Sequence, residues 1–346
     1  MINAVVIPAY KAASTIVGVV DRIGPEIQSI FVVDDCCPDG TGKLVQARCR
    51  DARVTVITHA VNQGVGAAFL TGMKAAIARH STIIVKVDAD GQMDPALIPA
   101  LIAPIKNGAA DFVKGNRFFF LSNASAMPAT RRFGNLALSF LAKLSSGYWH
   151  IMDATNGFFA IHASVADLLV ADRIAKRFFF ETDLLFHLGL VRAKVVDFPM
   201  QARYEDEVSN LRISRVFGEF VAGHLRNALR RILYKYFLRD FSIASIELVL
   251  GAFLLLFGLT FGTYHWIVGG MRDEFTPPGT VMIAAISLLI GFQLVLAFLN
   301  YDISSVPREP LHPMLLKKPS ASSDAKSSEL AKAQRTDIVE DADVPR

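Results

Sequence analysis

The fold of this chain is decided by its residues 85–95, whose sequence is Val85-Lys86-Val87-Asp88-Ala89-Asp90-Gly91-Gln92-Met93-Asp94-Pro95. The stretch begins with apolar, β-branched residues and ends in two carboxylates separated by one residue, with an amide two residues later. Mg²⁺ and Mn²⁺ prefer such hard oxygen ligands, and Mg²⁺ leaves most of its positions to water and phosphate. The pattern predicts a buried strand leading into a loop that suits Mg²⁺ or Mn²⁺ carrying a substrate diphosphate.

Two other interpretations of this loop were weighed. A calcium-binding EF-hand fails on spacing, because Met93 would stand at its glycine position and Pro99 at its closing glutamate position. A simple polar turn remains the alternative when the loop is taken by itself.

Short apolar runs alternate with helical patterns over the first 115 residues. The runs cover 4–8, 30–33, 54–58 and 83–87, with helix-like stretches at roughly 14–23, 40–50 and 66–79. This alternation predicts a mostly parallel sheet with right-handed crossovers. Ligands bind beyond the carboxyl ends of the strands in such sheets, so we expect the acidic loops at 34–39 and 88–90 to face one crevice.

The loop at 34–39 follows a second apolar strand. Asp39 suits a cap for the next helix, whereas the adjacent carboxylates of Asp34 and Asp35 exceed what a cap needs. They suit hydrogen bonds to the base or ribose of a nucleotide. The segment from Asn62 to Ala68 contains a partial GxGxxG with Phe69 in place of the third glycine, which favours close packing at a helix start over a dinucleotide site.

Composition limits the class of protein. The chain has 346 residues and a formal net charge of only +4, so a general nucleic-acid-binding role is not indicated. Its three cysteines, an odd number without CxxC spacing, predict a reducing compartment rather than a disulfide framework. The N-terminus has a strand pattern and not that of a cleaved export peptide.

Apolar residues make up 52% of the chain and concentrate after residue 240. Stretches at about 243–268 and about 280–300 reach the roughly 20 residues that a membrane span needs, and the short link from Gly269 to Gly279 predicts a hairpin. Basic residues flank the outer ends, whereas the link carries only Arg272, so we expect the large domain and the tail in the cytoplasm. Two buried helices of a soluble protein are the alternative.

Residues 213–239 combine apolar positions at helical spacing with arginines and lysines on the other faces. A basic amphipathic helix, or a broken pair, fits the membrane interface, and an ordinary surface helix is the alternative. Beyond about 305 the polar composition predicts a disordered tail.

Four groups of residues occur in a fixed order: Ile7-Pro8-Ala9-Tyr10, then Asp34-Asp35 with Asp39-Gly40-Thr41, then Asn62, Gly64 and Gly66, then Asp88-Ala89-Asp90-Gly91-Gln92. In this order they resemble family 2 inverting glycosyltransferases with the GT-A fold, above all the polyprenyl-phosphate enzymes of the dolichol-phosphate mannose synthase type. The resemblance covers about residues 2–210. It implies a Rossmann-like α/β catalytic domain (1–211). The patterns described above add amphipathic juxtamembrane helices (212–241), a transmembrane hairpin (242–302) that matches members with such anchors, and a disordered cytoplasmic tail (303–346).

On the donor side, the resemblance implies a role for each matching position. Asp34 and Asp35 look like contacts to the nucleotide base, in a pocket lined by Pro8, Ala9 and Tyr10. The acidic loop with Asp88, Asp90 and Gln92 looks like the segment that holds the metal and the sugar-nucleotide diphosphate, and Asp90 is taken as catalytic. Arg203, with Glu207 and Ser209, resembles a mobile loop that closes over the donor.

On the acceptor side, Arg117 resembles a phosphate-binding arginine, and Arg131 and Arg132 resemble the acceptor-phosphate arginines; Arg117 and Arg131 are taken as catalytic. Asn135 stands where the family has a small hydroxyl residue. Guanidinium groups bind phosphate oxygens bidentately, although each arginine alone also fits a solvated surface charge.

Glu181 and Asp183 are candidate substrate contacts, with a structural role equally open, because a phosphate acceptor is already mostly dianionic at neutral pH and needs little help from a base. The triplets Phe118–Phe120 and Phe178–Phe180 fit core packing better than a groove for isoprene units.

The resemblance therefore implies transfer of a sugar, with inversion, from a nucleoside diphosphate sugar to a membrane polyprenyl phosphate. A polysaccharide-building relative would be expected to show Gln-x-x-Arg-Trp, which neither Trp149 nor Trp266 completes. A non-catalytic scaffold is disfavoured by the intact acidic loop. The sugar, the base (GDP-mannose, UDP-glucose and UDP-GlcNAc stay open), the prenyl length and any homo-oligomer are not readable from the sequence.

Overall fold

The computed structural model describes residues 1–120, 129–201 and 213–316. Within these residues a seven-stranded sheet has the order β3-β2-β1-β4-β6-β5-β7. The strands are β1 (Asn3–Ala9), β2 (Ser29–Asp34), β3 (Val54–Thr58), β4 (Ile83–Lys86), β5 (Phe112–Asn116), β6 (Phe159–His162) and β7 (Val195–Pro199). Only β6 runs antiparallel to its neighbours among the pairs of this sheet. The predicted, mostly parallel α/β architecture is confirmed.

Helices cover both faces of the sheet, which explains why β1 and β4 are buried along their whole lengths and, apart from Asn3 and Lys86, apolar. One face packs against α3 (Val65–Ala78), α7 (Ala163–Asp167) and α8 (Phe180–Leu190), around Phe69 and Phe159. The other face packs against α1 (Ile16–Asp21), α2 (Thr41–Arg48) and α4 (Ile98–Lys106), around Ile7 and Val85. Short 3-10 turns lie at Pro95–Leu97 (η1) and Ala171–Arg173 (η2).

The register of the central strands brings their loops to one edge of the sheet. Ala9 of β1 pairs with Asp34 of β2, and Val6 of β1 pairs with Lys86 of β4. The loops that follow these strands therefore start side by side, as the sequence predicted for the two acidic loops.

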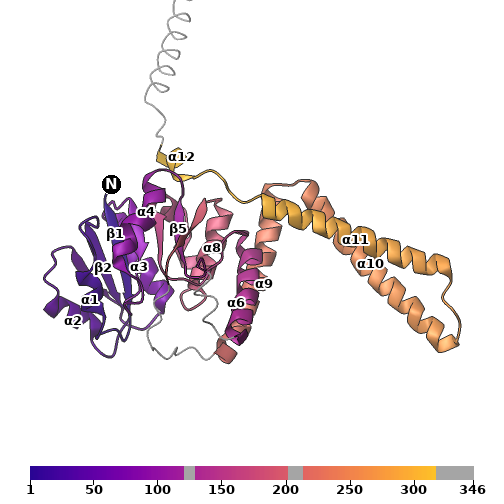
Figure 1. Cartoon of the computed structure of the whole chain (residues 1–346), viewed down its shortest axis with the longest axis horizontal. Helices are drawn as coiled ribbons and strands as arrows, with labels where there is room; N and C mark the ends of the chain where they lie inside the picture. Colours follow the sequence, from indigo (N-terminus) through magenta and orange to yellow (C-terminus); the bar gives the residue numbers. More distant parts are fainter. Residues whose placement is uncertain (121–128, 202–212, 317–346) are drawn as a thin grey trace, which may run out of the picture.

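The long helices α6 (Ala129–Ser146) and α9 (Ile213–Leu233) lie side by side against the domain (Figure 1). The face of α9 that packs inward carries polar side chains, among them His224, Asn227 and Arg231, which are all buried. Three of its large apolar side chains, Leu225, Leu229 and Leu233, point outward instead and are about half exposed. An ordinary surface helix would bury that apolar stripe, so this arrangement favours the interfacial interpretation.

A π-helical turn, η3 (Tyr234–Arg239), leads from α9 into two helices, α10 (Ile243–Arg272) and α11 (Pro278–Ser304), that project as a hairpin (Figure 1). Both are long and apolar enough to cross a membrane, and only 22% and 17% of their most apolar windows are buried. Core helices of a soluble protein would be mostly buried. Their backbones approach closely, because a Cβ atom on Gly291 would lie 2.8 Å from the backbone nitrogen of Leu255.

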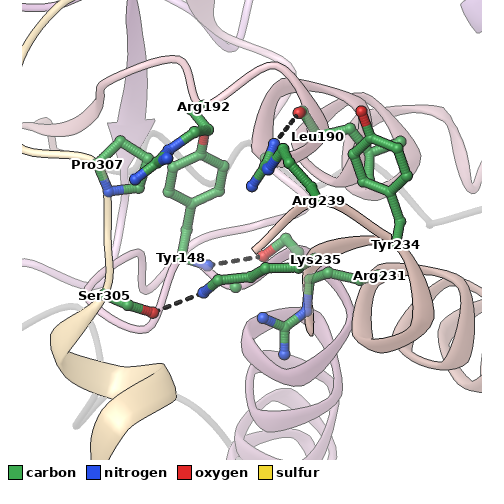
Figure 2. A pocket seen from close by; sticks show the side chains of 12 residues that line it. Tyr148, Leu190, Arg192, Arg231, Tyr234, Lys235, Arg239, Ser305 and Pro307 are labelled. Carbon is green, nitrogen blue, oxygen red and sulfur yellow. Dashed lines mark hydrogen bonds between the residues drawn. The ribbon is translucent and has the colours of Figure 1, made fainter. Parts of the chain in front are cut away.

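The hairpin is tied to the domain by a buried cluster that we call the hairpin joint: Trp149, Arg231, Lys235, Tyr236 and Asp302. Both terminal guanidinium nitrogens of Arg231 donate to the Asp302 carboxylate, at 2.7 and 2.8 Å. Figure 2 shows the small cavity beside this joint, where Lys235 donates to Ser305 and Arg239 donates to the carbonyl oxygen of Leu190.

The chain beyond α11 differs from the prediction of a disordered tail from about 305. Residues up to the short helix α12 (His312–Leu316) pack back on the domain. The buried carboxylate of Asp111 accepts hydrogen bonds from the backbone of Leu311 and His312 and from the imidazole of His312, at 2.7–2.8 Å. Both outer ends of the hairpin therefore meet the same domain. Residues 317–346 lie outside the described residues.

Candidate active site

A cavity of about 970 Å³ opens at the carboxyl ends of β1, β2 and β4. Six of the residues predicted for the donor side line it together: Pro8, Ala9, Tyr10, Asp35, Asp88 and Asp90. Arg177 and Phe178, which precede α8, form part of the same lining. The sequence analysis missed Arg177, because no local pattern brings residue 177 to the edge of β1.

Asp35 organises one wall of this cavity. Its carboxylate accepts hydrogen bonds from the His59 ring at 2.7 Å, from the Gln63 backbone at 2.9 Å and from the Gly64 backbone at 2.7 Å. The ring of His59 also contacts the hydroxyl of Thr71 at 3.0 Å. His59 was missed too, although its place directly after β3, at the ligand-binding edge, is a signal that could have found it.

Asp34 has a different task from its neighbour. Its carboxylate accepts from the backbone of Cys37 at 2.7 Å and from that of Gly42 at 2.8 Å, so it points to the start of α2 rather than into the cavity. Gly40 occupies the N-cap position of α2 and has no side chain with which to cap the helix. The cap predicted for Asp39 is thus wrong and belongs to Asp34, because the strand alternation turns Asp34 and Asp35 to opposite sides.

The acidic turn is held from within and from α1. The Asp90 carboxylate accepts from the Gln92 backbone at 2.9 Å, Gly91 adopts a positive φ of 83°, and the Thr15 hydroxyl donates to the carbonyl oxygen of Ala89 at 2.6 Å. These contacts keep Asp88 and Asp90 at the cavity wall. Among the described residues, no group of three or more His, Cys, Asp or Glu side chains could hold a metal ion.

Beneath this turn lies a cluster that we call the cleft floor: Lys86, Asp88, Lys114, Arg117, Asp153 and Glu181. The fully buried ammonium group of Lys86 pairs with Asp88 and lies 3.4 Å from Glu181. Burial by itself would lower the pKa of Lys86, but the carboxylates of Asp88 and Glu181 outweigh it and raise the pKa. Lys86 is therefore charged, and it joins the acidic turn to α8.

Lys114 lies in the middle of the cleft floor and donates to the carbonyl oxygen of Asn156 at 2.6 Å. Burial lowers its pKa to about 8, against the opposing charges of Glu181 and Asp153. Arg117 is bound bidentately by Asp153, at 2.8 and 3.0 Å, so Asp153 fixes the orientation of the predicted phosphate-binding arginine.

Glu181 and Asp183, the two acidic candidates on α8, have different partners. Glu181 faces Lys86 at the cleft floor. Asp183 accepts from the Ala175 backbone at 2.7 Å and from the Asn227 side chain at 2.6 Å, which ties α8 to α9 and favours its structural alternative. The residues of the second phenylalanine triplet lie in different environments: Phe180 is buried in the core, whereas Phe178 lines the cavity.

Several predicted residues lie outside the described part. The side chains of Arg131, Arg132 and Asn135, on the first turns of α6, are among them. So are Arg203, Glu207 and Ser209. Gln92 stays within the acidic turn, through its backbone contact with Asp90.

Residues 4–169 match the model of the protein family described as Glycosyl transferase family 2. The chain is 30% identical over 215 residues to UDP-N-acetylglucosamine–dolichyl-phosphate N-acetylglucosaminyltransferase of Methanococcus voltae, covering 58% of this chain and 85% of that one. It is 31% identical over 205 residues to polyprenol monophosphomannose synthase of Mycolicibacterium smegmatis, covering 57% and 75%. With undecaprenyl-phosphate mannosyltransferase of Micrococcus luteus it shares 27% identity over 226 residues, covering 64% and 91%.

Among solved structures, glucosyl-3-phosphoglycerate synthase from Mycobacterium tuberculosis, in complex with Mn²⁺, UDP and glucosyl-3-phosphoglycerate, has a similar fold. The TM-score is 0.50 at 20% identity, over 66% of this chain and 79% of that one. Likeness at this identity concerns the fold alone.

Proposed function

The chain belongs to glycosyl transferase family 2, and we propose that it transfers a sugar, with inversion, from a nucleoside diphosphate sugar to a polyprenyl phosphate in the membrane. One observation carries the proposal: the cavity in which the donor-side residues meet belongs to a domain that is tied directly to a membrane hairpin. The relatives in Methanococcus voltae, Mycolicibacterium smegmatis and Micrococcus luteus are named for dolichyl phosphate, polyprenol monophosphomannose and undecaprenyl phosphate.

The acidic turn fits a hard divalent cation that takes few protein ligands. Asp88 and Asp90 bring carboxylate oxygens to the cavity wall, and Gln92 completes the predicted set in the same turn. Asp90, with Gln92 in the same turn, would hold Mg²⁺ or Mn²⁺, which would neutralise charge on the leaving diphosphate as a Lewis acid. Crystals of the Mycobacterium tuberculosis synthase contain Mn²⁺ or Mg²⁺ together with UDP.

The donor would lie across the carboxyl ends of β1, β2 and β4. Pro8, Ala9 and Tyr10 would form one side of the base pocket. Asp35 holds two further residues of the cavity lining: its carboxylate accepts from the Gly64 backbone, and its carbonyl oxygen accepts from the Asn62 side chain at 3.1 Å. Arg177 lines the same cavity and would meet the diphosphate, and Arg203 would close over it. Positioning and charge neutralisation, rather than a protein nucleophile, supply the acceleration.

The acceptor phosphate would meet Arg117, which Asp153 orients, together with Arg131, Arg132 and Asn135 on α6. An oxygen of the acceptor phosphate forms the new bond to the anomeric carbon while the bond to the leaving diphosphate breaks on the opposite face. A phosphate dianion needs no proton removed. This agrees with Glu181, the acidic candidate at the cleft floor, being engaged by Lys86 instead of standing ready as a base.

The lipid chain would approach along the outward apolar faces of α6 and α9, where Leu136, Phe140, Leu225 and Leu229 are exposed. We place the domain and the segment after α11 in the cytoplasm. This placement rests on the basic residues that flank the outer ends of the hairpin, and the return of residues 311–312 to Asp111 keeps both ends on one side.

The test uses the purified full chain in detergent micelles with a short polyprenyl phosphate, Mn²⁺, and GDP-mannose, UDP-glucose or UDP-GlcNAc in turn. We expect one donor to give polyprenyl-phosphate-sugar, seen by mass spectrometry, with release of one equivalent of nucleoside diphosphate. Transfer to a hydroxyl acceptor but never to the lipid phosphate would replace this function with that of a different family 2 enzyme. No turnover of any sugar nucleotide would favour a scaffold.

A further inference from the structure

Lys86 is an unusual residue for its position. It ends β4, in the middle of an apolar sheet, and its side chain is fully buried. Its ammonium group meets two carboxylates from distant parts of the chain, Asp88 of the acidic turn and Glu181 of the first turn of α8. A buried charge of this kind is stable only when paired, so these contacts are part of the architecture of the cleft.

Both oxygens of the Asp88 carboxylate have close neighbours in the cleft wall. One Asp88 oxygen pairs with Lys86, and the other lies against the backbone of Gly157. A Cβ atom at position 157 would collide with both the Asp88 carboxylate and the Lys86 ammonium group, so only glycine leaves room for this pair. The sequence thus provides the space for Asp88 to turn toward Lys86 in the cleft wall.

An ammonium group and a divalent cation are poor neighbours on one carboxylate, because like charges repel strongly away from bulk water. A metal that used Asp88 would have to displace Lys86 or share an oxygen with it. Lys86 cannot leave, since it is enclosed by the sheet and also bound to Glu181.

We propose that Lys86 is a positioning residue that withholds the Asp88 carboxylate from the metal and joins it to Glu181, so that Asp90 is the carboxylate that takes the cation. The inference rests on the proposed function for the presence of a metal at this turn. It assigns Asp88 to the wall of the donor site and makes the distance between the acidic turn and α8 a fixed feature of the cleft.

Lys86→Met tests this directly. Mn²⁺ alone is titrated into the full chain in detergent, without donor or acceptor, and bound metal is measured by electron paramagnetic resonance. Removing the ammonium group frees Asp88, so Mn²⁺ should bind on the order of tenfold more tightly, while kcat falls because the turn loses its fixed position. A merely structural lysine predicts the opposite, since a loosened site binds metal more weakly.

The double variant Lys86→Met/Asp88→Asn tests whether the freed Asp88 carboxylate causes the tighter binding of Mn²⁺. It should lose the tighter binding, because the freed carboxylate is gone. If the gain persists, general electrostatics and not recruitment of Asp88 explains it, and the proposal is overturned. Lys114→Met, which removes an equally buried charge that pairs with no part of the acidic turn, should melt at a lower temperature without gaining that Asp88-dependent affinity.

If Lys86→Met does not fold, Lys86→Met/Glu181→Gln removes one opposing charge as well and should still bind Mn²⁺ more tightly than the unmodified chain. Equal or weaker binding by folded variants, including no binding by any of them, overturns the inference. The metal titration needs no lipid, so failure to glycosylate polyprenyl phosphate would remove the proposed acceptor and leave this result to be judged separately.

Discussion

The cleft floor and the hairpin joint are built from the same kinds of side chain, yet one is open and the other is closed. At the joint, Asp302 is fully buried and receives hydrogen bonds from Arg231, Lys235, Tyr236 and Trp149. At the cleft floor, Asp88 pairs with Lys86 and with no other cation of residues 1–120, 129–201 and 213–316, and its side chain is 29% exposed to the cavity. Lys114, in the same cluster, has a pKa that burial lowers.

The difference separates two uses of buried charge. A carboxylate whose oxygens are all engaged holds two elements in one geometry, and removing it leaves cations buried without partners. A cluster that opens to a cavity keeps electrostatic capacity for a ligand, here a diphosphate and its cation. Variants of the joint should therefore act on stability, and variants of the cleft floor and the acidic turn should act on turnover.

The largest effect on turnover is expected for Asp90→Asn, in the acidic turn above the open cleft floor. Asparagine keeps an oxygen that can accept from the Gln92 backbone but loses the charge that the cation requires. We expect turnover to fall by on the order of 10² to 10³, with the melting temperature of the purified chain almost unchanged. Undiminished turnover would remove the metal assignment, and a large drop in melting temperature would make the acidic turn a structural feature like the joint.

Asp302→Ala addresses the closed cluster. The change leaves Arg231 and Lys235 buried without their carboxylate, which typically costs about 3–5 kcal/mol. We expect a melting temperature lowered by several degrees, and detergent-solubilised protein that remains folded should retain its kcat at low temperature.

The matched control for the joint is Asp240→Ala. Asp240 is 41% exposed and pairs with Arg239 at 3.1 Å on the surface beside the joint. Exposed pairs contribute less than about 1 kcal/mol, so this variant should melt close to the unmodified chain. Equal losses in the two variants would show that the joint is not a closed, cooperative cluster.

Arg117→Lys should have an intermediate effect that is confined to the acceptor. Lysine keeps the charge but cannot make the bidentate pair with Asp153 that orients Arg117. We expect kcat/KM for polyprenyl phosphate to fall by roughly tenfold, while KM for the donor stays the same. Arg48→Lys, on the exposed last turn of α2, is the control. A shift in donor KM alone would move Arg117 from the acceptor side to the diphosphate.

Local sequence patterns predicted the strands and the long helices, because these elements depend mainly on residues close together in the chain. The four apolar runs became β1 to β4, and the two long apolar stretches became α10 and α11. Strand alternation turns Asp34 and Asp35 to opposite sides, but the sequence could not show which of the two faces the cavity, since that depends on how the strand lies relative to its neighbours.

Pairings between distant residues were beyond the sequence for a different reason. Lys86 meets Glu181, Arg117 meets Asp153 and Asp111 meets His312, across separations that only the assembled sheet defines. The polar composition after residue 305 indicates that this segment has no core of its own. The buried Asp111 carboxylate nevertheless binds its backbone, and Val306 and Leu311 pack against the core of the domain. The open and closed clusters are both tertiary features in this sense.

The smallest expected effect tests how open the cleft floor is, through the pH dependence of stability. Burial lowers the pKa of Lys114 to about 8 from its ordinary 10.5. Between these values the unfolded chain binds more protons than the folded chain, so the contribution of Lys114 to the free energy of unfolding rises with pH and is lowest below pH 8. The melting temperature of the unmodified chain minus that of Lys114→Met should therefore increase by a few degrees from pH 7.5 to 9.5.

Lys74→Met is the control, because Lys74 pairs with Asp172 on the surface, where both side chains are largely exposed. Its difference from the unmodified chain should be flat over the same pH range. A flat or falling difference for Lys114→Met would mean that Lys114 keeps its proton in the folded chain. The charges around it would then be as fully matched as those at Asp302, and the contrast between an open cleft floor and a closed joint would have to be given up.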